Sequence, residues 1–495
     1  MNLRTLIPCA LIGILALPSG WAEESPKPNI VFVLCDDLGY GDIHCLNPER
    51  GKIPTPGVDR LAKEGMIFTD AHSGSAVCTP TRYGLMTGRY SWRTPHQRGV
   101  VQGFKPCLIA EGRPTVAGFL KEQGYHTSIV GKWHLDFQYA DPDSGDLLKR
   151  PKGKKGKNLA PVGSKIPDGP VNRGFDYFHG FHHAGDMRGV IENDVVIAHE
   201  DEIHMLPRLT RKAVEYIDER AKKAKDEPFF LYVPYGSPHT PILPTKEWQG
   251  KSGLGAYGDF VMETDDGFKQ ILEALDRNGF ADNTLVIFSA DNGCSKAADI
   301  KGLEDQGHFP SAHLRGSKAD LWDGGHRVPF VVRWPGKVEA GSTSDQLICL
   351  TDLMATCAEL LDSKLPGGSA EDSVSFLPAL SGKPIESTRE GVIHHSISGH
   401  FGYRKGKWKL LLARGSGGWT APKENEAKKI GSPVAQLYDL EKDPGETKNL
   451  YESQPEVAAS LLAQLEEDVT SGRSTAGPES KNDTTDIKLW KSGEK

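Results

Sequence analysis

The sequence predicts an α/β protein with a mostly parallel central sheet between helices, and a small antiparallel sheet with one helix near its C-terminus. Four short apolar runs of strand length each end in polar residues, and helix-like segments alternate with them. This alternation is typical of parallel sheets that are covered on both faces. After about residue 387, short strand patterns follow one another directly, which predicts the antiparallel part.

Each apolar run leads into side chains of the kind that carry out chemistry. The runs are residues 30–34, 127–130, 229–233 and 285–288. The polar residues that follow them are Asp36, Asp37, Lys132, His134, His239, Asp291 and Asn292. In open α/β sheets, ligands bind beyond the carboxyl ends of the strands, so we expect these side chains to gather at one edge of the sheet.

The remaining elements give a two-part organisation. Helix-like patterns cover residues 58–65, 115–123, 209–225, 258–277, 353–361 and 456–467, and late strand patterns cover 391–396 and 407–412. We predict a main domain over residues 23–386 and a smaller α+β subdomain over 387–470. Residues 471–495 are polar and poor in apolar side chains, which predicts a tail with little structure of its own.

Residues 1–22 have the pattern of a secretory signal peptide. One early charge, Arg4, precedes an apolar run over residues 9–18, and small residues lead to a cleavage point near Ala22. The run is too short to span a bilayer, and no later stretch reaches the roughly 20 apolar residues that a spanning helix needs. We therefore expect export to the periplasm or the extracellular space, with no transmembrane segment.

Net charge and cysteine content narrow the class of protein further. The 59 basic and 66 acidic residues give a net charge of -7, which gives no reason to expect nucleic-acid binding. Loss of Cys9 with the signal peptide would leave seven cysteines: Cys35, Cys45, Cys78, Cys107, Cys294, Cys349 and Cys357. In an oxidising compartment, an odd number leaves at least one thiol outside disulfides and up to six that can pair. Unpaired buried cysteines would give the same count.

Residues 76–89 place a thiol and a guanidinium four residues apart across a proline. Proline is tolerated in the first turn of a helix, so Pro80 predicts a helix that brings Cys78 and Arg82 onto one face near its start. A helix N-terminus also favours anions. Taken alone, the pattern equally fits a buried cysteine beside a surface arginine.

Carboxylates and an amide follow two of the predicted strands: Asp36, Asp37, Asp291 and Asn292. Their oxygens suit calcium or magnesium better than zinc. The same residue types also cap helices and form turns. For Asp36 and Asp37 that alternative is weak, because two adjacent carboxylates at a buried strand end repel each other unless a cation lies between them.

Two lysines and two histidines complete the set of candidate active-site residues: Lys132, His134, His239 and Lys318. Each of them alone is only weak evidence of a functional site. On an extended backbone Lys132 and His134 would point the same way, and Trp133 would point into the packing. Two prolines restrict the loop around His239, although a turn histidine bonded to backbone would look the same. Lys318 alone fits an ordinary solvated lysine.

The segment Cys78-Thr79-Pro80-Thr81-Arg82, with residues 85–89 after it, resembles the signature of the type I sulfatases. This is the formylglycine-dependent arylsulfatase family of the alkaline phosphatase superfamily. Further segments resemble the family in the same order, and the resemblance covers roughly residues 28 to 450: 28–37, 131–135, 237–241, 289–293, 315–318, 324–329 and the closing 437–450. It implies an alkaline phosphatase-like fold. The family most often has serine at the position of Thr81, but the cysteine, proline and arginine are in place.

The resemblance implies a mechanism for hydrolysis of a sulfate ester. Cys78 would be oxidised by a maturation enzyme to formylglycine, and one hydroxyl of the hydrated aldehyde, polarised by calcium and Arg82, would attack sulfur. Lys132 and Lys318 would hold the sulfate oxygens. His239 would protonate the leaving alcohol, and His134 would take the proton of the second hydroxyl so that the aldehyde reforms.

The resemblance also implies one Ca²⁺, with Mg²⁺ as the alternative, bound by the residue at position 78 and by Asp36, Asp37, Asp291 and Asn292. Three cationic side chains and a divalent ion against three carboxylates would leave the site at about +2, which suits a small anion. The charge does not separate sulfate from phosphate esters. The alternatives are therefore a phosphodiesterase or phosphonate hydrolase of the same superfamily, and an inactive secreted glycan-binding protein.

Two segments bear on the substrate. Residues 175–187 offer Tyr177, His179, His182, His183 and Asp186, a set suited to sugar hydroxyls, although ordinary loop packing would use the same residues. The basic run at 149–157 fits either a solvated loop or an arm that attracts an anionic polymer. Our hypothesis is a sulfated carbohydrate or a small aryl sulfate.

Overall fold

The computed structural model describes residues 26–150, 159–386 and 389–491. Its centre is a ten-stranded sheet with the strand order β11-β2-β10-β9-β1-β8-β4-β5-β6-β7. The strands are β1 (Asn29–Asp36), β2 (Met66–Phe68), β4 (His126–Lys132), β5 (Tyr177–Phe181), β6 (Gly189–Glu192), β7 (Val195–His199), β8 (Phe229–Pro238), β9 (Thr284–Ala290), β10 (Phe330–Arg333) and β11 (Ser342–Ser344).

The middle of this sheet confirms the predicted parallel arrangement. Strands β9, β1, β8, β4 and β5 run parallel to one another, whereas β10, β6 and β7 run antiparallel to their neighbours. Every residue of β1, β8 and β9 is buried, as expected for strands that helices cover on both faces. The apolar runs of the sequence therefore form the innermost strands.

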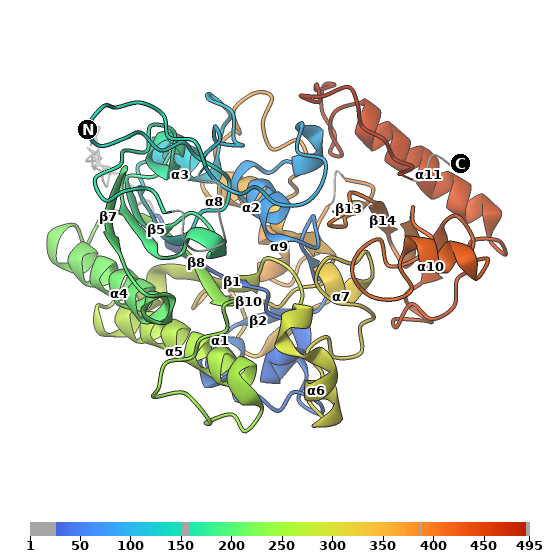
Figure 1. Ribbon diagram of the computed structural model, residues 1–495, viewed down its shortest axis with the longest axis horizontal. Coiled ribbons are helices and arrows are strands. Elements are labelled where there is room, and N and C mark those ends of the chain that lie inside the picture. The colour runs from blue at the N-terminus through green and yellow to red at the C-terminus, as the bar shows by residue number, and fades with distance from the viewer. Residues whose placement is uncertain (1–25, 151–158, 387–388, 492–495) are drawn as a thin grey trace, which may run out of the picture.

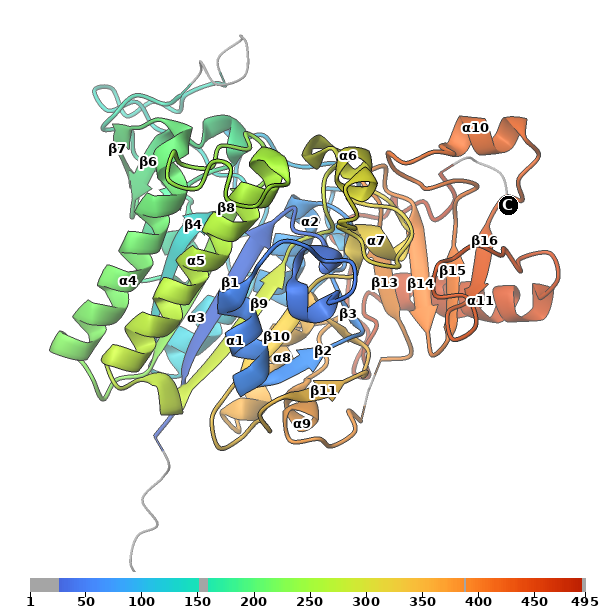
Figure 2. The same ribbon diagram turned by 90° about the horizontal axis from the view of Figure 1, so that it is seen from below.

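Helices cover both faces of the sheet (Figures 1 and 2). One face carries α1 (Pro56–Glu64), α4 (Met205–Lys223) and α5 (Gly255–Arg277). The other carries α2 (Cys78–Thr87), α3 (Val116–Glu122) and α8 (Leu353–Leu360). Short helices are α6 (Ile300–Asp305), α7 (Asp323–His326) and α9 (Leu377–Leu380), and β3 (Ala71–His72) pairs with β12 (Ile348–Cys349).

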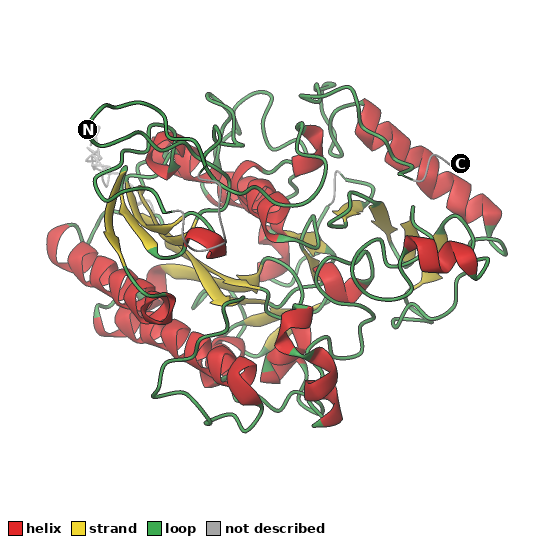
Figure 3. Ribbon diagram, viewed as in Figure 1, coloured by secondary structure: helices red, strands yellow, loops and turns green. Residues whose placement is uncertain are grey.

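A second, four-stranded antiparallel sheet lies beside the large one (Figure 3). It consists of β13 (Val392–His395), β14 (Phe401–Lys405), β15 (Trp408–Leu411) and β16 (Gln436–Asp439). Helix α11 (Pro455–Thr470) packs on β14 and β15, and α10 (Glu424–Lys429) lies between β15 and β16 in the chain. The fold class is thus the one that the sequence predicts.

The segment after residue 470 is attached more firmly than its composition predicts. Between residues 471 and 491 the structure has neither helix nor strand. Asp483 nevertheless pairs with the buried Arg89, with an Oδ2–Nη1 distance of 2.9 Å, and the Asn482 side chain accepts a hydrogen bond from Arg93. These polar contacts, which no apolar pattern in the sequence predicts, hold the segment against the main domain.

Two other expectations fall wholly or partly outside the described residues. The predicted signal peptide, residues 1–22, lies outside them, and so do residues 151–157 of the basic run 149–157. Within the described chain, no helix combines the length and apolar character needed to cross a bilayer. The seven cysteines that we considered for pairing are all unpaired thiols, and all except Cys45 are buried.

Candidate active site

The carboxyl ends of four neighbouring strands meet at one edge of the large sheet. Strands β9, β1, β8 and β4 lie side by side in that order. The predicted residues at or just after their ends are Asp291 and Asn292 for β9, Asp36 and Asp37 for β1, His239 for β8, and Lys132 and His134 for β4. The strand pattern alone therefore places seven candidate side chains at one edge.

Helix α2 brings Cys78 to this edge. It begins at Cys78, with Pro80 in its first turn, as the sequence predicts, and all ten of its residues are buried. The Cys78 Sγ atom lies 3.3 Å from Asp36 Oδ1 and 3.8 Å from Lys318 Nζ. Burial, together with Asp291 and Asp36, raises the pKa of the thiol. An uncharged thiol is a poor nucleophile, so an unmodified Cys78 is not activated for attack.

The four oxygen-bearing residues form a compact buried group. Asp36, Asp37, Asp291 and Asn292 each expose 1% or less of their surface. Burial and the neighbouring Asp36 raise the pKa of Asp291 to about 7. Burial also raises the pKa of Asp36, but Lys132 leads the cationic groups that outweigh burial and hold it well below its usual range.

Two oxygens of this group have no hydrogen-bond partner although they are buried: Asp37 Oδ2 and Asn292 Oδ1. An unpaired buried oxygen costs roughly 1–3 kcal/mol, more when it is charged. Asp36, Asp37, Cys78 and His239 each place one candidate ligand atom within 4.8 Å of the others. Hard oxygens with unused acceptor capacity suit a cation such as Ca²⁺ or Mg²⁺, so the residues present fit the metal that the sequence implies.

Arg82 holds the carboxylates of two strands together. Its Nη2 and Nε donate to Asp291 Oδ2 at 2.7 and 3.0 Å, and Nη2 lies 3.8 Å from Asp36 Oδ1. Its Nη1 donates to the Lys132 carbonyl at 3.1 Å. Arg82 is thus fully engaged, and it links α2 to the ends of β1, β4 and β9.

The two lysines come from different elements and pair with different carboxylates. Lys132 Nζ, at the end of β4, contacts Asp36 Oδ2, and Lys318 Nζ, from the loop before α7, contacts Asp37 Oδ1. Both lysines are buried. Each ammonium group therefore lies beside a carboxylate and close to residue 78, where an anionic substrate group would need cations.

His134 corrects one expectation. The backbone is not extended there, because His134 has a φ of 57°, so Lys132 and His134 are not aligned as on a strand. The turn places His134 Nε2 3.2 Å from the Val101 carbonyl, and its own carbonyl accepts from Thr79 beside Cys78. Asp37 also has a positive φ of 64°, an unfavourable conformation that is common at functional sites.

His239 marks the open side of the site. Its side chain is 19% exposed, whereas that of Asp37 is 1% exposed, and its Nε2 lies 3.6 Å from Asp37 Oδ2. Burial lowers the pKa of His239, and Asp37 opposes that change only in part. A leaving group that departs toward solvent would pass this histidine.

Residues 175–187 are divided between two locations. The first half is strand β5, where His179 Nδ1 faces Glu192, 3.7 Å away, and Tyr177 lines a separate cavity, so ordinary packing, one of the two alternatives left open by the sequence, describes these two residues. His183 stacks on His134, with 5.5 Å between ring centroids, and its Nδ1 lies 3.4 Å from Asp186 Oδ2. His182 is also beside His134. The second half therefore borders the active site.

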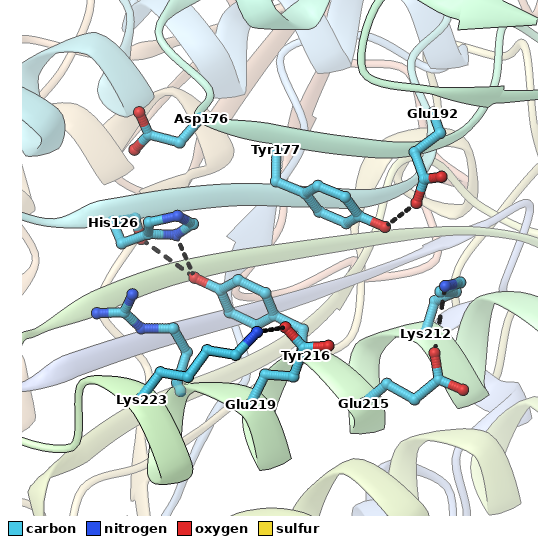
Figure 4. Close-up of a pocket in the computed structure, with 10 residues that line it drawn as sticks. His126, Asp176, Tyr177, Glu192, Lys212, Glu215, Tyr216, Glu219 and Lys223 are labelled. Atoms are coloured by element: carbon cyan, nitrogen blue, oxygen red, sulfur yellow. Dashed lines mark hydrogen bonds and ion pairs between the residues drawn. The ribbon is translucent and has the colours of Figure 1, made fainter.

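A cavity of about 420 Å³ lies elsewhere, between β4, β5, β6 and α4 (Figure 4). His126, which lines it, begins β4, and Lys132 ends β4 about 20 Å further along the strand. Figure 4 shows its polar groups paired with one another: Tyr177 with Glu192 at 2.7 Å, and Tyr216 with His126 at 2.9 Å. It offers no converging reactive groups and is not the active site.

The fold and this site define a class. A doubly covered α/β sheet carries a buried helix N-terminus, flanking cations and a metal-type carboxylate group at its carboxyl edge. These are the parts of a hydrolase that acts on anionic esters.

Comparisons with known proteins identify the family. The Sulfatase family model matches residues 28–363. An N-acetylgalactosamine-6-O-sulfatase of Bacteroides thetaiotaomicron is 32% identical over 499 residues, covering 90% of this chain and 93% of that protein. Human arylsulfatase A is 30% identical and covers 93% of this chain and 92% of its own length. A solved B. thetaiotaomicron structure, from work on its metabolism of multiple glycosaminoglycans, has 30% identity and a TM-score of 0.77 over 90% of this chain and 100% of that one.

The chain belongs to the sulfatase family, the type I sulfatases of the alkaline phosphatase superfamily. It is an enzyme that hydrolyses sulfate esters.

Sequence reasoning missed one buried group, formed by His72, His326 and His394. Only His326 lay in a segment that resembled the family, and the three residues are far apart in the chain. The pairing of β3 with β12 and the place of β13 bring them together, and neither leaves a periodic signal.

Proposed function

We propose that Cys78 is matured to formylglycine and that, with one bound Ca²⁺, it serves hydrolysis of the sulfate ester of a sulfated sugar. The observation that carries this proposal is the position of Cys78: it begins α2, with Asp36 and Lys318 beside its sulfur. An unactivated, buried thiol between a carboxylate and an ammonium group has no evident use as it stands. A hydrated aldehyde at the same position would offer two hydroxyls to these neighbours.

Asp36, Asp37, Asp291 and Asn292, together with residue 78, would hold the calcium ion. The unpaired oxygens of Asp37 and Asn292 support this assignment. When bound, the ion would neutralise the adjacent carboxylates and polarise the oxygen of residue 78. Mg²⁺ is the alternative ion, and ion analysis of the purified protein distinguishes the two.

The side chains around residue 78 have complementary tasks. Lys132 and Lys318 hold the sulfate oxygens as point charges, and Arg82 keeps the Asp291 carboxylate and the start of α2 in position. A hydroxyl oxygen of residue 78 attacks sulfur and passes its proton to Asp36 Oδ1, the carboxylate oxygen beside it. The bond between sulfur and the alcohol oxygen breaks, and the imidazolium form of His239 gives the alcohol its proton. Sulfate is then bonded to residue 78.

His134 serves the second step, in which sulfate leaves. Its Nε2 faces the Val101 carbonyl, which can only accept, so a neutral ring carries its lone pair on Nδ1. Nδ1 is buried without a partner. Burial, with Lys132 and His183 adding to it, lowers the pKa of His134 well below its usual value and keeps the ring neutral. Nδ1 takes the proton of the second hydroxyl, the aldehyde reforms, and the bond from carbon to the sulfate oxygen breaks.

The substrate proposal rests on the relatives and on the border of the site. The two sequence relatives named above act on N-acetylgalactosamine 6-O-sulfate and on aryl sulfates, as their names state. His183 and Asp186, beside His134, offer hydrogen bonds to sugar hydroxyls. We take a 6-O-sulfated N-acetylgalactosamine as the first candidate.

Sulfate release tests the proposal directly. Protein co-expressed with a formylglycine-generating enzyme is assayed on N-acetylgalactosamine 6-sulfate, its 4-sulfate isomer, N-acetylglucosamine 6-sulfate, an aryl sulfate and the matching aryl phosphate. The proposal expects the highest kcat/KM on the first sugar and much less on the phosphate. Turnover of aryl phosphate above every sulfate would contradict it, and preference for another sugar would refute the substrate assignment alone.

The cellular setting follows the same reasoning. Residues 1–22 act as a signal peptide cleaved near Ala22, and the mature chain is exported to the periplasm or outside the cell. The mature chain divides into a catalytic domain to residue 386, an α+β subdomain to 470 and the polar segment 471–495. N-terminal sequencing of the exported protein tests the cleavage point.

A further inference from the structure

Three buried histidines meet where the large sheet joins the four-stranded sheet. His72 ends β3, His326 ends α7 and His394 lies in β13. Each exposes 1% or less of its surface, and one ring nitrogen of each lies within 4.8 Å of the others. This three-histidine cluster shares no residue with the catalytic site.

The hydrogen bonds of two rings fix where their protons lie. His72 Nε2 is 2.8 Å from Asp70 Oδ1, and His326 Nε2 is 3.0 Å from the Leu321 carbonyl. A carboxylate and a carbonyl only accept, so each Nε2 carries the hydrogen. Both Nδ1 atoms of the neutral rings then carry lone pairs, and they face each other at 3.0 Å. Two lone pairs at that distance repel unless a cation lies between them.

The third ring adds another lone pair. His394 Nδ1 is 3.2 Å from the Ser73 carbonyl, which places the hydrogen on Nδ1. Its Nε2 is buried and has no hydrogen-bond partner. The His394 ring stacks on His326 with 3.8 Å between centroids. Three neutral imidazoles thus present unused lone pairs to one buried space.

A bound proton explains these contacts less well than a metal ion does. One proton could bridge His72 and His326, but it would leave His394 Nε2 unpaired. Burial also lowers the pKa of all three rings, and that of His326 lies well below its usual value. A metal ion, by contrast, would use one nitrogen from each ring.

The surroundings resemble the outer shell of a metal site. A histidine that binds a metal usually donates its other N–H to a carboxylate or a backbone carbonyl, and all three rings do so here. Nearby charges balance one another: Asp70 pairs with Arg327 and Arg404, and Lys409 pairs with Asp323 and Glu446. No excess of cations opposes a metal ion.

We propose that His72, His326 and His394 bind one Zn²⁺ ion, with water or hydroxide as the fourth ligand, and that this ion ties β13 to β3 and α7. Zinc accepts three imidazoles in a tetrahedral site with Zn–N distances near 2.1 Å, which sets the nitrogens about 3.4 Å apart. The present separations, all within 4.8 Å, require small movements inward, including a tilt of the stacked His326 and His394 rings.

The test uses the full-length protein purified without a metal-affinity tag. We expect about one zinc per chain by elemental analysis, and a higher melting temperature after Zn²⁺ is added to metal-depleted protein. His394→Gln should reduce zinc at least tenfold. His395→Gln is the matched control, because His395 is the next residue of β13, equally buried, and outside the cluster. It should retain zinc, and so should Cys78→Ala, which separates this site from the catalytic ion.

A second measurement uses the wild-type protein alone, so its outcome does not depend on whether a variant folds. Co²⁺ added to metal-depleted wild-type protein should produce the intense visible absorption of a tetrahedral cobalt site, and Zn²⁺ should displace it. Absence of that absorption, wild-type protein without zinc after refolding with Zn²⁺, or His394→Gln that keeps its zinc would each overturn the proposal.

Discussion

Two buried clusters of charged residues in this enzyme both combine aspartates with cationic side chains. They differ in how many of their side-chain oxygens have hydrogen-bond partners. The catalytic cluster combines Asp36, Asp37 and Asp291 with Arg82, Lys132 and Lys318, and the junction cluster combines Asp352 and Asp372 with Arg93 and Arg389. The residues of both clusters are buried. The junction cluster joins residues 89–93, 349–374 and 389, and it also reaches Ser474.

The difference lies in the unused acceptors. In the junction cluster, Asp372 accepts from Arg93, from the Tyr90 amide and from Ser474, all at 2.7–3.1 Å. In the catalytic cluster, the buried oxygens Asp37 Oδ2 and Asn292 Oδ1 accept nothing. Burial of charge alone therefore does not indicate a catalytic site. Burial combined with several unpaired ligand atoms that lie together beside cationic side chains, as at Asp37 and Asn292, indicates a place for a cation and an anionic substrate.

The largest expected effect is on residue 78. Cys78→Ala should reduce kcat for sulfate release by at least about 10⁴-fold, because it removes the nucleophile, and should change the free energy of unfolding by no more than about 2 kcal/mol. Cys357→Ala is the matched control: a buried thiol in α8, away from the site, that should keep full activity per folded molecule. Residual turnover of Cys78→Ala near the wild-type rate would refute the assignment.

Lys318→Met should have the next largest effect. It removes one charge that faces residue 78 while retaining most of the side-chain volume, and we expect kcat/KM to fall about 10²- to 10³-fold. Lys296→Met, on a lysine that lies over Trp419, should stay within about twofold. Equal losses in both variants would show that the effect of Lys318 is not local.

Asp372→Asn tests whether the junction cluster stabilises the fold without taking part in catalysis. It breaks a buried ion pair with Arg93 and should lower the free energy of unfolding by about 3–5 kcal/mol, with little change in kcat per folded molecule. Denaturant unfolding and active-site titration measure the two quantities. A loss of activity at unchanged stability would make this cluster catalytic and would remove the contrast.

The same residue predicts a pH dependence. Burial raises the pKa of Asp372, but Arg93 outweighs burial, so its net pKa lies below the usual value. The folded protein therefore binds this proton less readily than the unfolded chain does. The stabilisation is present above about pH 4 and is lost as the pH falls below it. Asp372→Asn should show a shallower loss of melting temperature between pH 5 and pH 3 than the wild type.

The smallest predicted effect concerns the border of the site. His183→Ala should raise KM for the preferred sugar sulfate about tenfold, because the side chain would contact the sugar, and should change aryl sulfate hydrolysis less, through its stacking on His134 alone. Tyr177→Phe, in the remote cavity, serves as the control. Unaltered sugar preference in both His182→Ala and His183→Ala would exclude this segment from substrate binding.

The sequence could predict which side chains lie at the carboxyl edge of the sheet. It could not predict the turn at that edge or the distant segments that pack against the main domain. Apolar runs that end in Asp36, Lys132 or Asp291 give both a buried strand and its position, since parallel strands align their carboxyl ends. The left-handed turn at His134 and the contact of Asp483 with Arg89 depend on tertiary packing, which leaves no periodic pattern. Likewise, no spacing rule links His72 to His394, 322 residues further along the chain.

The mass of the tryptic peptide that spans residues 64–82 tests the central claim most directly. It is measured in protein co-expressed with a formylglycine-generating enzyme, alongside sulfate release from the same sample. The account predicts an aldehyde in place of the Cys78 thiol, with activity in proportion to the modified fraction. An intact thiol in an actively hydrolysing sample, from a host that matures a control sulfatase, would contradict it.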